Sequence, residues 1–180
     1  QTLLTNNGDY NNAIGREAMK LNTTGYENNA FGYQTLAANT TGYGNNAIGF
    51  GALLLNTTGA GNNAIGSYAL RTNTSGFDNN AFGYNALYTN TTGTGNTAIG
   101  HTSLYSNSVG IYNNAFGYQA LHDNTTGIRN CAMGAAALGA NVTGTNNVAV
   151  GDLAAQYLKG SYNVSVGSNA LNLSQANQNT

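Results

Sequence analysis

The side chains that could perform acid–base catalysis are few and scattered along this chain. Its six carboxylates are Asp9, Glu17, Glu27, Asp78, Asp123 and Asp152. A glycosidase or lyase site needs two carboxylates that converge within a few ångströms. Asp9 and Glu17 share one stretch of chain, but no base or orienting partner gathers with them. We therefore expect no catalytic residue and no enzyme activity.

Metal and thiol chemistry is equally sparse. A zinc site needs three or four ligands at fixed spacing, whereas the chain has two histidines, His101 and His122, and one cysteine. Cys131 has no histidine close to it in sequence, which favours a small packed residue over a nucleophile. Calcium-binding rolls repeat an aspartate in a Gly-Gly-x-Gly-x-Asp motif, and no aspartate recurs in that way here. We expect no metal and no cofactor.

A recurring Asn-Thr-Thr-Gly motif suggests two kinds of surface chemistry. Its asparagines form sequons, so that the candidate glycan attachment sites are Asn22, Asn39, Asn56, Asn73, Asn90, Asn124 and Asn141. However, any Asn/Thr-rich turn produces sequons, and an asparagine ladder buried by its neighbours exposes no acceptor. A flat threonine column could instead order water and bind ice. Adjacent threonines in an extended segment point to opposite faces, which favours a turn whose hydroxyls bond the backbone.

These motifs belong to a tandem repeat of 17 residues. We count positions 1 to 17 from the asparagine of Asn-Thr-Thr-Gly, as in residues 22–38. Position 4 is Gly, position 7 is Asn and position 11 is Gly in all ten copies. Residues 1–4 match the end of a preceding repeat, residues 5–173 form ten copies, and residues 174–180 leave the pattern. One residue is missing near Asn6–Gly8 and another between Asp152 and Gly160.

A period this short predicts a stack in which neighbouring coils bury what one unit cannot. Two glycines per unit leave no room for an ordinary helix, and glycine suits corners that need a positive φ. We therefore expect an all-β parallel β-solenoid (a β-roll) with one 17-residue coil per turn. Asparagine ladders should exchange amide hydrogen bonds between coils. We expect position 10 (Ile14, Phe31, Ile48, Ile65, Phe82, Ile99, Phe116, Met133, Val150 and Val166) and the leucines of position 15 to face inward, with Ala at positions 9 and 14 keeping the walls close.

The variable positions carry the distinctive side chains. Positions 5, 6, 12, 13, 16 and 17 hold nearly all the Tyr, Arg, Glu, His and Asp residues, so we expect them to face solvent or other chains. Among the twelve tyrosines, Tyr33, Tyr84 and Tyr118 stand at position 12 and Tyr26 and Tyr43 at position 5. Such columns could bind sugars or protein partners, although cross-coil packing is the favoured reading. A ligand would then be bound along a column, through avidity.

The repeat resembles known surface-fibre repeats. The segments Asn146-Asn147-Val148-Ala149-Val150-Gly151 and Asn163-Val164-Ser165-Val166-Gly167 are similar to the Asn-x-Val-Ala-Ile-Gly repeat of trimeric autotransporter adhesin heads. The Asn-Thr-Thr-Gly-x-x-Asn-Asn-Ala-Ile-Gly-Tyr-x-Ala-Leu unit also resembles repeats of phage tail-fibre-like and bacterial surface-fibre proteins. The resemblance spans about residues 5–173 and implies a left-handed roll that assembles as a homotrimer. The 17-residue unit is longer than the usual head unit, and position 8 is mostly Asn where the heads have Val.

Composition narrows the function further. Charged residues make up 6% of the chain and the net charge is −1, which gives no electrostatic attraction for nucleic acid. No apolar run is long enough to span a membrane, and the start at Gln1 suggests a processed segment. We expect an extracellular, cell-surface or virion fibre segment with a structural and adhesive role. Its expected partners are identical chains, in a homotrimer or an end-to-end filament, and glycans or a host surface. The alternative is a ligand-binding solenoid that uses its Tyr or Thr columns for glycans or ice.

Overall fold

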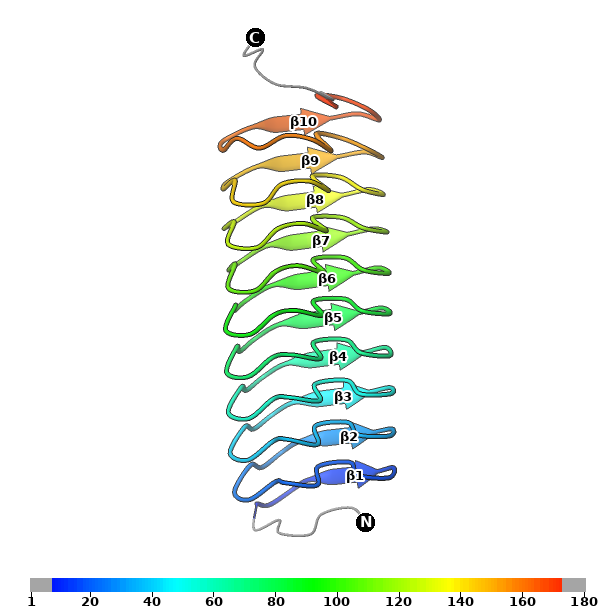
Figure 1. Cartoon of the computed structure of the whole chain (residues 1–180), viewed down its shortest axis with the longest axis vertical. Coiled ribbons are helices and arrows are strands. Elements are labelled where there is room, and N and C mark those ends of the chain that lie inside the picture. The colour runs from blue at the N-terminus through cyan, green and yellow to red at the C-terminus, as the bar shows by residue number, and fades with distance from the viewer. Residues whose placement is uncertain (1–7, 173–180) are drawn as a thin grey trace.

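The chain is a rod of stacked coils, and each coil adds one short strand to a common wall (Figure 1). The structure, a computed structural model, describes residues 8–172, so the predicted segments 1–4 and 174–180 lie outside the described residues. The described residues contain no helix, and hence none that could cross a membrane. The strands are β1 (Asn12–Ile14), β2 (Asn29–Phe31), β3 (Asn46–Ile48), β4 (Asn63–Ile65), β5 (Asn80–Phe82), β6 (Thr97–Ile99), β7 (Asn114–Phe116), β8 (Cys131–Met133), β9 (Val148–Val150) and β10 (Val164–Val166).

The strands pair in parallel and in sequence order, from β1 to β10. Each residue faces its equivalent one coil later, as in Ala47 opposite Ala64. The β9–β10 pair is offset by 16 residues instead of 17, because Val148 faces Val164. The predicted all-β parallel solenoid with 17-residue coils is therefore confirmed, and the residue missing between Asp152 and Gly160 shortens the connection from β9 to β10.

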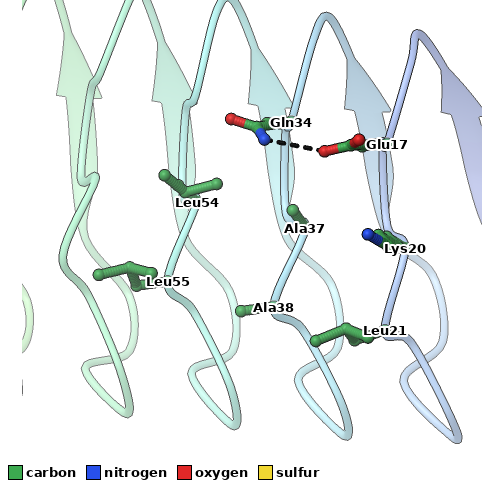
Figure 2. Close-up of a pocket in the computed structure, with 8 residues that line it drawn as sticks. All are labelled: Glu17, Lys20, Leu21, Gln34, Ala37, Ala38, Leu54 and Leu55. Atoms are coloured by element: carbon green, nitrogen blue, oxygen red, sulfur yellow. Dashed lines mark hydrogen bonds between the residues drawn. The ribbon is translucent and has the colours of Figure 1, made fainter.

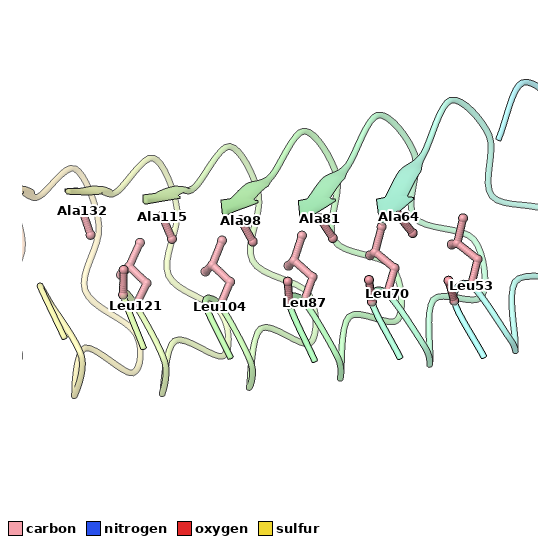
Figure 3. Packing of buried hydrophobic residues seen from close by; sticks show 14 of the residues in the cluster. Leu53, Ala64, Leu70, Ala81, Leu87, Ala98, Leu104, Ala115, Leu121 and Ala132 are labelled. Atoms are coloured by element: carbon pink, nitrogen blue, oxygen red, sulfur yellow. The ribbon is translucent and has the colours of Figure 1, made fainter. Parts of the chain in front are cut away.

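The apolar core is a narrow seam of alanine and leucine. In the second to eighth coils the alanines of positions 9 and 14 and the leucines of position 15 are fully buried, as Ala64, Ala69 and Leu70 illustrate. In Figure 3 the position-15 leucines form one row that faces the row of strand alanines. These predictions are confirmed, and the small alanine side chains allow the two walls to approach closely.

Position 10 does not face inward, contrary to the prediction. Ile65 is 40% exposed and Ile14 is 65% exposed, and no residue of this column is buried. Successive side chains of a strand point to opposite faces, and the alanine of position 9 takes the inward direction in every coil but the tenth, where Ser165 takes it. The interior is too narrow for a larger side chain there, so the larger apolar residues lie outside.

The two invariant glycines serve different purposes. At position 11 the backbone has φ of +132° at Gly66, a conformation that favours glycine. At position 4 no positive φ occurs, but a Cβ on Gly76 would lie 2.4 Å from both the Oδ1 of Asn73 and the carbonyl oxygen of Gly93. Position 11 thus needs glycine for its backbone dihedral, and position 4 needs it for close approach.

Left-handed backbone also occurs at non-glycine residues, which the sequence did not reveal. Positions 6, 13 and 15 all have positive φ, and the buried leucines of position 15 lie near +50° (Leu70, φ 50°). This conformation costs a non-glycine residue about 1–2 kcal/mol. Full burial of a leucine side chain contributes about 1.5–3 kcal/mol and offsets that cost.

Two columns of asparagine line the interior beside this seam, at positions 1 and 7. The Nδ2 of Asn62 donates to the Oδ1 of Asn45 (3.1 Å) and to the carbonyl of Gly76 (2.9 Å). Its own Oδ1 accepts from the backbone N–H and the Nδ2 of Asn79. At position 1, Asn56 donates to Asn39 Oδ1 and Gly59 O in the same manner. The predicted amide ladders are therefore confirmed.

The end of the ninth coil and the start of the tenth depart from this pattern. Ala155 stands at position 15 in place of leucine, and Leu158 replaces the asparagine of position 1 and packs against the core. Because Leu158 has no amide, the Oδ1 of Asn141 is left without a hydrogen-bond partner. The position-1 ladder therefore ends at Asn141, one coil before the last described strand.

Candidate functional site

The strand wall presents the most continuous surface feature. The apolar side chains of position 10 point outward along all ten strands, with six of the ten members at least 40% exposed. Beside them, at position 8, an outer asparagine ladder runs over β1 to β5, where Asn46 donates to Asn63 and Asn63 to Asn80 at 2.8–2.9 Å. No residue of positions 8 to 10 is charged. This face is therefore a long apolar strip edged by amides.

The six carboxylates do not converge on one place. They occupy five different positions of the coil, and no group of three or more His, Cys, Asp or Glu gathers anywhere in residues 8–172. Asp152 accepts a hydrogen bond from the backbone N–H of Ala135, which is a structural contact between coils.

Glu17 is a carboxylate whose pKa is lowered by its neighbours. A hydrogen bond from Gln34 Nε2 to Glu17 Oε2 (2.8 Å) lowers its pKa, and the charges of Lys20 and Arg16 act in the same direction. Glu17, Gln34 and Lys20 border a shallow notch of about 260 Å³ in the turn wall of the first three coils (Figure 2). The remaining lining is Ala and Leu, including Ala37 and Leu54, and holds no second acid or base. The notch exists because positions 16 and 17 are alanines in the second coil, whereas the first and third coils carry larger side chains at these positions.

The two histidines belong to aromatic stacks. His101 lies between Tyr84 and Tyr118, with ring centroids 5.1 and 5.5 Å away. His122 stacks on Tyr105 at 5.3 Å and its Nδ1 lies 2.7 Å from the Oδ1 of Asp123. Cys131, half-buried in β8, has no histidine beside it in the register of the strand wall. Neither histidine is placed as a metal ligand.

All seven sequon asparagines are members of the position-1 ladder. Their side chains are completely buried. In Asn56 the Nδ2, the atom that a glycan would modify, already donates two hydrogen bonds, at 2.8 and 3.0 Å. The folded coil has no room for a glycan at Asn22, Asn39, Asn56, Asn73, Asn90, Asn124 or Asn141. The asparagines of position 1 are therefore explained by the buried ladder of amide hydrogen bonds, which was the alternative to glycan attachment.

The threonines of the same motif divide between two directions. The Oγ1 of Thr40, at position 2, donates to the carbonyl of Thr57 in the next coil at 3.0 Å. The neighbouring Thr41, at position 3, is exposed. Only one threonine column therefore faces solvent, and the other uses its hydroxyls on the backbone, as the turn reading predicts.

The tyrosine columns are ladders of stacked rings. Tyr26 and Tyr43 stack at 4.9 Å with an interplanar angle of 3°, and Tyr33 stacks on Phe50 at 5.0 Å. A sugar platform uses the face of an aromatic ring, and in each of these stacks one face of each ring is covered by its neighbour. The favoured reading of cross-coil packing is supported by these contacts.

The outward direction of position 10 was not predicted from the sequence, although the sequence contains a signal for it. Positions 9 and 10 are neighbours on one strand, and the alanine found at position 9 in nine of ten coils fits a narrow interior better than Ile or Phe.

No family model, curated protein or solved structure matches this chain. The resemblance to adhesin heads and surface fibres accordingly stays a prediction.

Proposed function

We propose that this chain is a segment of an extracellular structural or adhesive fibre, in which identical rods associate side by side. A homotrimer is the assembly that the resemblance implies. The observation that supports the proposal most is the apolar strip of position 10, from Ile14 to Val166. In this proposal the chain contributes length, stiffness and a repeated surface, and no catalysis.

The strip is unusual for a surface that meets only water. A contiguous exposed apolar patch marks an interaction site in most soluble proteins, and at about 4.8 Å per coil this one runs for roughly 45 Å. Burial of such residues contributes about 25 cal/mol per Å² of apolar surface. Positions 8 to 10 carry no charged residue, so identical strips can approach without like-charge repulsion within the strip.

The proposal is tested by the mass of the full-length chain in solution, measured by sedimentation and light scattering. We expect an oligomer at micromolar concentration. The double substitution Ile65→Asn with Ile99→Asn places two polar groups in the strip and should weaken association at least tenfold. Val109→Asn is the matched control, because Val109 is 46% exposed but lies at position 3, away from the strip. A stable wild-type monomer, or equal weakening by the control, would overturn the proposal.

A further inference from the structure

We infer that Tyr26 and Tyr43 are a site of oxidative cross-linking, at which a dityrosine bond joins the second coil to the third. Their rings are stacked at 4.9 Å and are nearly parallel, at 3°. Both side chains are exposed, by 42% and 47%, so an oxidant can reach them. This inference concerns the single chain and does not depend on the proposed assembly.

The backbone keeps the two phenols in register. Tyr26 and Tyr43 both occupy position 5, and the N–H of Gly44 donates to the carbonyl of Tyr26 at 3.0 Å. Equivalent Cε atoms of two parallel rings in register therefore lie about one coil spacing apart, roughly 4.8 Å. Position 5 is Asp9 in the coil before and Ala60 in the coil after, so no ring flanks the pair, and no other tyrosine occupies position 5. Two phenoxyl radicals formed here can couple only with each other within the column.

The reaction needs a one-electron oxidant, for which we take hydrogen peroxide with a haem peroxidase. Each phenol loses the hydrogen atom of its O–H group. The two radicals form a Cε–Cε bond, and the proton of each coupled Cε then moves to the oxygen and restores the phenol. Two tyrosines and one hydrogen peroxide thus give one dityrosine and two waters.

Other tyrosines provide comparisons inside the same molecule. Tyr84 and Tyr118 are as exposed as the pair, at 48% and 53%, but His101 lies between them. Tyr88 and Tyr105 stack at 5.2 Å, but both are half-buried and the Arg71 guanidinium lies 5.5 Å from the Tyr88 ring. A nearby cation opposes removal of an electron, so this second pair should couple more slowly than Tyr26 and Tyr43.

The experiment treats the full chain with peroxidase and hydrogen peroxide and maps the cross-linked peptides by mass spectrometry. We expect a peptide that joins Tyr26 to Tyr43 and lacks two hydrogen atoms, together with dityrosine fluorescence. Tyr26→Phe and Tyr43→Phe should each abolish that peptide. In a mixture of isotopically labelled and unlabelled chains the peptide should carry one isotope only, because the bond forms within a chain.

Two further outcomes decide the inference. His101→Tyr should create a new cross-link to Tyr84 or Tyr118, since it completes an uninterrupted stack. Absence of the Tyr26–Tyr43 peptide under conditions that couple free tyrosine would overturn the inference. Mixed-isotope peptides, or wild-type coupling of Tyr84 to Tyr118 at the level of the pair, would also overturn it, because stacking within the chain would then not select the site.

Discussion

The asparagine ladders inside the rod and the isoleucine–phenylalanine column outside it reverse the usual distribution of polarity. Asn45 and Asn62 are completely buried, whereas Ile48 and Ile65 are 45% and 40% exposed. An ordinary core excludes amides because an unpartnered one costs about 1–3 kcal/mol. Here the buried amides find their partners in the identical residues one coil away, except where the position-1 ladder ends at Asn141, and so the cost does not arise along the ladders.

The difference between the two regions teaches that stacking decides which residues can be buried. A ladder of identical amides is self-satisfying, since every donor and acceptor repeats at the coil spacing. A ladder of identical charges would repel. The interior therefore accepts Asn, Ala and Leu at their own coil positions, and the Ile and Phe residues of position 10 are left for contact with something outside the chain.

The sharpest test compares two neighbouring asparagines, Asn62 inside and Asn63 outside. Asn62→Ala removes the Oδ1 that accepts from both the backbone N–H and the Nδ2 of Asn79, whereas Gly76 O keeps its donor Asn73. It should lower the free energy of unfolding by about 3–5 kcal/mol, from two buried N–H donors left without this acceptor. Asn63→Ala breaks a half-exposed ladder and should cost below about 1 kcal/mol. Denaturant unfolding measures both, and equal losses would show that the inner ladder is not special.

The leucine seam should respond next. Leu70→Ala leaves a cavity between the two alanine rows and should cost about 2–4 kcal/mol. Leu55→Ala is its control, because Leu55 lies at position 17 and is 41% exposed; it should cost under about 1 kcal/mol. If the two variants unfolded at the same denaturant concentration, the seam would not be the core.

Substitution of the position-4 glycine, where the backbone lies close to its neighbours, should lower the free energy of unfolding by a smaller amount. Gly76→Ala brings a Cβ within 2.4 Å of two oxygen atoms and should cost about 1–3 kcal/mol, as overpacking does. Gly44→Asn at position 6 is the contrast. The Cβ there meets only the backbone nitrogen of Gly61, at 3.9 Å, and asparagine tolerates its φ of +62°. Thermal unfolding should show little change, or a gain, for Gly44→Asn, and destabilisation of both variants alike would contradict this account.

The outer column should matter little to the folding of one chain. If Ile65 faced inward, as the repeat predicts, Ile65→Asn would cost about 2–4 kcal/mol through lost burial and desolvation. With Ile65 40% exposed, we now expect at most about 1 kcal/mol for the unassociated chain. Unfolding at low protein concentration checks this value. A loss above the Leu70→Ala effect would mean that position 10 is part of the core after all.

The smallest effect concerns Glu17. A folded-state pKa below the ordinary value adds stability that is present above that ordinary value and is lost as the pH falls through the folded-state pKa. Gln34→Ala removes the hydrogen bond that is the main cause of the lowered pKa, so the Glu17 pKa should rise toward its ordinary value. Carboxyl titration by NMR measures it. Gln119→Ala is the control, because Gln119 occupies the same coil position as Gln34 but lies in the seventh coil, far from Glu17 in the first. It should leave the Glu17 pKa unchanged.

Much of the fold follows from local pattern. The 17-residue spacing of Gly, Asn and Ala predicted parallel coils in register, and the pairing of Ala47 with Ala64 confirms it. The leucines and alanines of the seam, the amide ladders and the outward variable positions were also predictable, since each recurs at one coil position. The left-handed φ of Leu70 was not predictable, because leucine rarely adopts it and only packing of the whole coil compensates its cost.

The sequence by itself determined the period, the residues of the ladders and the absence of charge from the strand positions. Only the tertiary structure decided which side of the strand faces inward. Ala64 and Ile65 are consecutive strand residues and both are apolar, so hydrophobicity alone does not decide which of the two side chains faces the interior. The distance between the two walls, set by the buried asparagine and leucine columns, admits a methyl group and excludes a larger side chain. That spacing exists only once the coil has closed, which is why Ile65 lies on the outside.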